Sequence, residues 1–250
     1  MGRAFEFRKE RKMKRWGHMA KTFTKIGKEI TIAVKQGGPD VVGNSRLRAL
    51  MAEARSENMP KDNVEKAIKR ALEKNQGDFK EVVFEGYGPH GIAYLVETAT
   101  DNNTRTVANV RSYFTKCGGS LGTSGSVSFM FDHKCVFRIK YQEGMDIDEL
   151  QLALCDCDDD PEVFIEEQED KDENITKNVV IYGAYESYGA IQKYIEDNGY
   201  ELVSGGFERI PNVDLKDVTP EQRETLDKLT GLLEDDDDVT NVYNTLKPAE

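Results

Sequence analysis

The chain has 250 residues and a formal net charge of −12, but this charge is divided: residues 1–80 carry 20 Lys and Arg against 10 Asp and Glu, whereas residues 81–250 carry 14 against 36. The chain has four cysteines, no apolar run of the roughly 20 residues that a membrane helix needs, and no signal-peptide pattern. These features exclude a disulfide scaffold and a membrane span, and they predict a cytoplasmic protein without a membrane partner. The basic end, at +10 against −22 elsewhere, favours a polyanionic partner, because charges interact over a Debye length of about 8 to 10 Å.

The most basic segment is residues 8–15, which hold six cations in eight positions. We predict that these side chains contact the phosphate groups of nucleic acid: Arg8, Lys9, Arg11, Lys12, Lys14 and Arg15. A solvated, disordered arm is the alternative, because runs of like charge usually lie on the surface.

Three amphipathic helices are predicted in the first 79 residues, at 22–34, from 44 or 45 to 58, and from Pro60 to Gly77. Apolar residues recur in them every three or four positions, so the helices can cover one another and leave their cations outside. We therefore predict a basic helical domain over residues 1–79 that binds nucleic acid. Its further candidate contacts are Lys21, Lys25, Lys28, Arg46, Arg48, Lys61, Lys66, Lys69 and Arg70.

The period changes to that of strands after residue 80. Strands are predicted at 82–84, 92–97 and 126–131, with a helix that starts near 101–104 and ends before Gly118. Within this otherwise acidic part, Arg105 and Arg111 gain nothing obvious from the fold, so we place them on a nucleic-acid-binding surface facing the basic domain.

Residues 135–205 follow the order β-α-β-β-α-β, with strands at 136–139, 163–165, 179–182 and 200–203, which is typical of a ferredoxin-like domain. The C-terminal part, with a strand at 207–210, a helix that begins at Pro220 and a strand near 242, needs a sheet to join, and the sheet begun at residue 82 is the best host. The predicted fold class is thus α+β: an N-terminal helical bundle, a second domain of residues 80–134 plus 206–250, and a third ferredoxin-like domain of residues 135–205 inserted in the second.

Three long segments resemble the YebC/PmpR family: NMPKDNVEKAIKRAL at 58–72, EGYGPHGIAYLVETATDNNTRTVANVRSYF at 85–114 and GGSLGTSGSVSFMF at 118–131. That family also contains the mitochondrial translational activator of cytochrome oxidase subunit I. The resemblance implies a helical domain and two α/β domains around a cleft, and cytoplasmic control of gene expression through nucleic acid without catalysis. At its start this chain has GRAFEF at 2–7, where many members carry a Gly-His-Ser-Lys-Trp segment.

No catalytic or metal-binding pattern stands out. The spacing of Cys155 and Cys157 does not fit structural zinc, the acidic runs at 156–160 and 235–238 lack the features of an EF-hand and are interpreted as solvated loops, and no nucleophile motif or phosphate loop occurs. We therefore expect no enzyme, no cofactor and no small-molecule substrate.

The sequence leaves three functions open. A DNA-binding transcriptional regulator is the first. A ribosome-associated translation factor is the second, in which the basic end binds ribosomal RNA and the acidic part docks basic ribosomal proteins. The third is a protein-interaction module whose basic end contacts an acidic partner protein.

Overall fold

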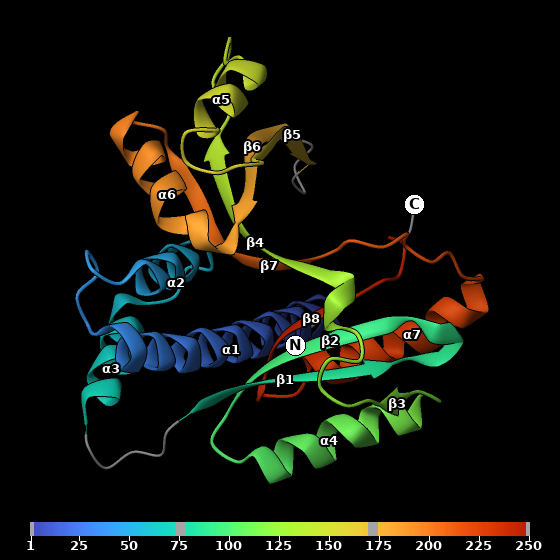
Figure 1. Ribbon diagram of the computed structural model, residues 1–250. Helices are drawn as coiled ribbons and strands as arrows, with labels where there is room; N and C mark the ends of the chain where they lie inside the picture. Colours follow the sequence, from blue (N-terminus) through green and yellow to red (C-terminus); the bar gives the residue numbers. More distant parts are fainter. Residues whose placement is uncertain (1–2, 74–78, 170–174, 249–250) are drawn as a thin grey trace.

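A computed structural model describes residues 3–73, 79–169 and 175–248; for residues 3–18, 168, 169 and 175 it describes the backbone alone. The three domains are ordered as the fold class predicts, with a helical N-terminal region and two antiparallel four-stranded sheets (Figure 1). Within the described residues, no helix combines the length and apolar character that a bilayer span requires.

The N-terminal domain consists of helices α1 (Arg3–Gly37), α2 (Ser45–Ser56) and α3 (Lys61–Leu72). Helix α1 is much longer than the predicted 22–34, because residues 3–21 are mostly good helix formers but lack the apolar period on which the prediction relied. It ends, as predicted, at the glycine pair, where Gly38 adopts a φ of 83°. Asn44 caps α2 by accepting the N–H of Leu47 at 3.0 Å.

The helices of this domain enclose one apolar cluster, which explains their amphipathic patterns. Its buried members from α1 include Ile26 and Ile30, and α2 and α3 contribute Leu47 and Val64. Because the apolar faces meet here, the basic residues of α3 remain on the outside of the domain.

The second domain contains the sheet with strand order β3-β1-β2-β8. Its elements are β1 (Lys80–Tyr87), β2 (Ala93–Thr100), α4 (Asn103–Lys116), β3 (Ser120–Leu121), α7 (Pro220–Glu234) and β8 (Val239–Asn244). Helices α4 and α7 share one apolar cluster with strands β1, β2 and β8 and thus cover the same face of the sheet. The predicted addition of the last strand to this sheet is confirmed by the pairing of β8 with β2.

The third domain contains the sheet with strand order β5-β6-β4-β7, and every neighbouring pair is antiparallel. Its elements are β4 (Phe131–Lys140), α5 (Ile147–Leu154), β5 (Glu162–Glu169), β6 (Ile175–Ala184), α6 (Tyr188–Asp197) and β7 (Leu202–Pro211). The β-α-β-β-α-β order and this arrangement confirm the ferredoxin-like prediction.

One predicted strand, residues 126–131, is wrong. Residues 128–130 form a 3₁₀ helix, and β4 starts at Phe131. The backbone N–H groups of Gly125, Val127 and Ser128 donate to the buried carboxylate of Glu85 at 2.7, 2.7 and 2.8 Å, so a side chain takes the hydrogen bonds that a neighbouring strand would otherwise satisfy.

The separate strands predicted at 200–203 and 207–210 are in fact one strand, β7, which pairs with β4 from Leu202 to Pro211. Gly205 lies inside this strand opposite Phe137, and a Cβ there would approach the Phe137 ring to 3.0 Å, which favours glycine at the position. The prediction that residues 207–210 join the first sheet is therefore wrong. We propose residues 131–211 as the bounds of the inserted domain.

Candidate nucleic-acid interface

The predicted basic segment forms the first part of α1, but its side chains lie outside the described residues. The backbone of residues 8–15 is helical. The phosphate contacts of Arg8, Lys9, Arg11, Lys12, Lys14 and Arg15 therefore stay a prediction.

Three lysines of α1, Lys21, Lys25 and Lys28, do not face solvent freely but contact the end of α7. The Lys21 ammonium lies 2.8 Å from the Asp235 carboxylate, and the Lys25 ammonium donates to the carbonyl oxygen of Glu234 at 2.7 Å. A helix C-terminus attracts cations because its last carbonyl groups lack partners within the helix. The spacing of three and four residues places all three lysines on one face of α1. This face contacts the second domain.

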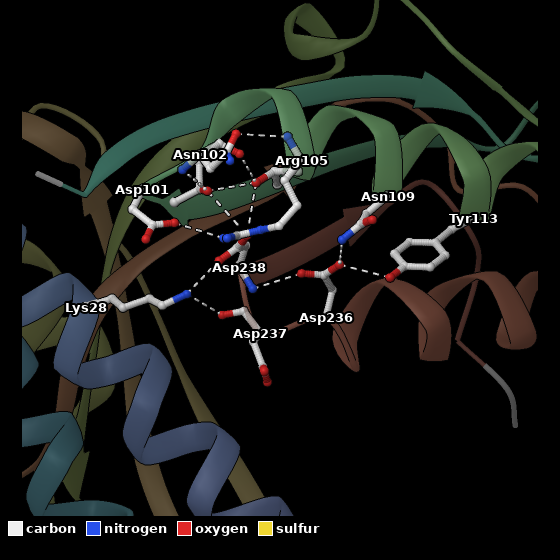
Figure 2. A network of polar contacts seen from close by, with 11 residues as sticks. Lys28, Asp101, Asn102, Arg105, Asn109, Tyr113, Asp236, Asp237 and Asp238 are labelled. Carbon is white, nitrogen blue, oxygen red and sulfur yellow. Dashed lines mark hydrogen bonds and ion pairs between the residues drawn. The ribbon is translucent and has the colours of Figure 1, made fainter. Parts of the chain in front are cut away.

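Asp238 is the centre of this contact (Figure 2). Its carboxylate accepts hydrogen bonds from Lys28 at 2.7 Å, Arg105 at 2.6 Å and Thr106 at 3.0 Å, and its side chain is 6% exposed. Burial alone would raise the pKa of Asp238, but the hydrogen bonds from Lys28 and Arg105 outweigh it and lower the pKa to about 2. One carboxylate thus joins the N-terminal domain to helix α4.

Asp236 extends the same network toward the middle of α4 (Figure 2). Its carboxylate accepts from the Tyr113 hydroxyl at 2.9 Å and from the side-chain amide of Asn109 at 3.2 Å. Burial, and then the hydrogen bond to Asp236, raise the pKa of Tyr113 to about 12, so the hydroxyl stays a donor at neutral pH. The interpretation of the run 235–238 as a solvated loop is therefore wrong for Asp236 and Asp238, which are both buried.

Helix α3 presents a different basic surface, which we call the α3 face: Lys66, Lys69 and Arg70. All three side chains are exposed, and none makes an ion pair or hydrogen bond with any side chain in the described part of the chain. Lys61, one turn earlier, lies 3.7 Å from Glu65. The charge of the α3 face is thus not neutralised by a carboxylate among the described residues.

A groove of about 500 Å³ adjoins the α3 face, between α1 and α3. Its polar lining includes Lys66 and Arg70, and two aromatic rings, Phe23 and Phe79, lie in the same groove. The Lys28 ammonium is 5.5 Å from the centroid of the Phe79 ring. The remaining lining residues are Ala20, Thr24, Gly27, Met59, Asn63 and Ala67. Cations beside aromatic rings are the combination that proteins use to bind nucleic-acid strands.

A second cleft, of about 510 Å³, lies where the three domains meet. Arg46 lines it and forms an ion pair with Glu81 of β1, and Arg48 of α2 lies 3.8 Å from Glu196 of α6. Burial, and then the neighbouring Glu53, raise the pKa of Glu29 to about 8. Since Arg46 and Arg48 are occupied by carboxylates of other domains, they serve the domain interfaces.

The comparisons with known proteins cover nearly the whole chain. A family model described as "TACO1/YebC protein N-terminal domain" matches residues 3–74, and one described as "TACO1/YebC second and third domain" matches residues 79–246. The chain belongs to the TACO1/YebC family. The resemblance found in the sequence motifs is thereby confirmed.

Curated members of the TACO1/YebC family are similar over their full length. A protein of Parabacteroides distasonis is 61% identical over 99% of this chain and 97% of its own, and one of Bacteroides thetaiotaomicron is 58% identical over 100% and 98%. Both are named "Probable transcriptional regulatory protein". The crystal structure of a conserved hypothetical protein from Aquifex aeolicus matches with a TM-score of 0.74 and 32% identity, over 92% of this chain and 91% of that one.

In this TACO1/YebC protein, the predicted site residues thus divide into groups. Lys21, Lys25, Lys28, Arg46, Arg48 and Arg105 contact acidic groups or carbonyl oxygens of other elements. The α3 face and Arg111 are exposed, and no ion pair of Arg111 occurs within the described residues. The structure joins Arg105 to the basic domain through Asp238 and Lys28, whereas Arg111 lies on the same helix without a connection to that network.

Sequence reasoning missed Phe79 and the two buried aspartates. Phe79 stands alone before β1 and carries no local pattern. The aspartates stand in a run of four identical residues that forms the turn before β8, so nothing in the sequence distinguishes the buried Asp236 and Asp238 from their exposed neighbours.

Proposed function

We propose that this protein regulates transcription, without catalysis, by binding nucleic acid through the N-terminal domain. The observation that supports the proposal is the contrast between α1 and α3. The lysines of α1 at positions 21, 25 and 28 are occupied by the end of α7, whereas Lys66, Lys69 and Arg70 of the α3 face have no acidic partner in the described residues. The relatives' name supports transcription as the process.

The proposed contact is with the phosphate backbone. Cations that neutralise phosphates release condensed counterions, so the logarithm of the affinity falls with the logarithm of salt concentration by about 0.9 per phosphate contacted on duplex DNA. The acidic remainder of the chain repels a polyanion and confines binding to the basic surface.

The test is the affinity of the full chain for duplex DNA at several salt concentrations, compared with the double variant Lys66→Gln, Arg70→Gln. We expect the variant to bind about tenfold or more weakly at low salt and with a salt slope smaller by nearly 2, because two phosphate contacts are lost. The matched control is Lys140→Gln with Lys193→Gln in the third domain, which should change neither quantity. Equal binding by wild type and the α3 variant would contradict the proposal.

A second candidate function is translation control through ribosomal RNA. The groove favours it, because Phe23 and Phe79 offer stacking surfaces that suit the unpaired bases of RNA loops. The acidic domains would then contact basic ribosomal proteins. Sedimentation of a lysate with and without RNase distinguishes the two: RNase-sensitive migration with ribosomal subunits supports translation, and complexes that resist all nucleases indicate an acidic protein partner instead.

A further inference from the structure

We propose that the groove between α1 and α3 is a binding site for an unpaired nucleotide, whose base stacks on Phe79 and whose flanking phosphates contact Lys66 and Arg70. The inference rests on the proposed nucleic-acid function and adds the class of ligand: single-stranded or looped nucleic acid.

The size and chemistry of the groove fit this ligand. Its volume of about 500 Å³ falls within the range of small-ligand sites, roughly 300 to 1,000 Å³. Bases in a duplex are already stacked and paired, so an aromatic ring inside a groove can serve only a base that has left the stack.

The ring of Phe79 is held in place before any ligand arrives. The Lys28 ammonium lies 5.5 Å from its centroid, and the same ammonium is fixed by Asp238 at 2.7 Å. A cation over the ring face orients the ring, and the ion pair orients the cation. Stacking on a ring that is already ordered costs less conformational entropy than stacking on a free one.

Charge on the rim of the groove complements the phosphates on either side of a base. Lys66 and Arg70 are one helical turn apart on α3, both line the groove, and neither has an acidic partner among the described residues. Asn63 also lines the groove, and its side-chain amide makes no hydrogen bond within the described part of the protein. An amide carries both donors and an acceptor, so it suits the edge of a base.

The test uses short single-stranded oligonucleotides, ribo and deoxyribo, that carry a fluorescent adenine analogue, and the same sequence as a duplex. With wild-type protein we expect the emission of the analogue to rise on binding to the single strands, because the base leaves the quenching stack of its neighbours for the ring of Phe79. Phe79→Leu, which keeps the apolar volume and removes the ring, should abolish this change and weaken single-strand binding about tenfold. Duplex binding should not change. The control is Phe129→Leu, because Phe129 is 65% exposed and lies outside the groove.

Inorganic polyphosphate provides a second measurement that does not depend on the stability of the variant. It carries the charge without bases, so wild-type protein should prefer the oligonucleotide over polyphosphate of equal charge. Equal affinity for oligonucleotide and polyphosphate, together with unchanged single-strand binding by Phe79→Leu, would contradict the nucleotide-binding site in the groove. The proposed function would not be affected by that result. Failure of wild-type protein to bind any nucleic acid would instead overturn the proposed function.

Discussion

Replacing Asp238 with alanine should lower the free energy of unfolding by about 3 to 5 kcal/mol, because it removes a buried carboxylate and leaves the half-buried Lys28 without its counter-charge. The Lys28 side chain is 12% exposed, so water cannot fully replace the lost partner. The folded pKa of Asp238 is about 2 against an ordinary 3.8. The carboxylate therefore stabilises the fold above about pH 3.8, and this contribution disappears as the pH falls through 2. Chemical denaturation at neutral pH measures the difference.

Asp237→Ala is the matched control for this prediction. Asp237 is the exposed neighbour, and its contribution to the network is a backbone carbonyl that accepts from Lys28 at 2.8 Å, which alanine preserves. It should change the unfolding free energy by less than about 0.5 kcal/mol. Similar losses in both variants would mean that net charge, and not the buried network, stabilises this interface.

Replacing Glu29 with glutamine should change the free energy of unfolding differently at two pH values. Relative to wild type, the variant should gain more than about 2 kcal/mol between pH 4.5 and pH 8. The folded pKa is about 8 against an ordinary 4.5, so the folded state retains a proton that the unfolded state loses between these values. Wild-type stability therefore falls as the pH rises from 4.5 to 8, by about 1.4 kcal/mol per unit of pKa difference. Glutamine cannot ionise, so the variant lacks this decline.

Glu224→Gln on α7 is the control for Glu29→Gln. It removes an exposed carboxylate and leaves the carboxylates of the cleft unchanged. The Glu224 variant should follow the wild-type pH profile. If the Glu29 variant also followed it from pH 4.5 to pH 8, then Glu29 would ionise normally in the folded protein.

Much of the fold followed from local patterns. The apolar period of residues 45–56 predicted α2, and the order of short segments after residue 135 predicted the ferredoxin-like sheet. The failures occurred where tertiary contacts decide. Gly205 lies mid-strand where Phe137 occupies the space of a side chain, and residues 126–130 are not a strand because Glu85 accepts the N–H groups of Val127 and Ser128. Neither neighbour is visible locally.

The candidate site was predictable as a class of interaction but not residue by residue. Charge division identified the basic domain, yet Lys21 and Asp235, which pair in the structure, are 214 positions apart in the sequence. Sequence alone gave these lysines and the α3 face equal weight. In the structure the end of α7 contacts α1 but not the α3 face. The lysines of α1 therefore bind acidic and carbonyl groups of the second domain, whereas the cations of the α3 face remain exposed.

The most direct test of this account is photo-crosslinking of thionucleotide-containing oligonucleotides to the full chain, with the attached peptides located by mass spectrometry. We predict crosslinks in α3, residues 61–72, and at Phe79, with none at the α7 end near residues 234–238. Crosslinks concentrated in the third domain, residues 131–211, with α3 unmodified, would contradict it.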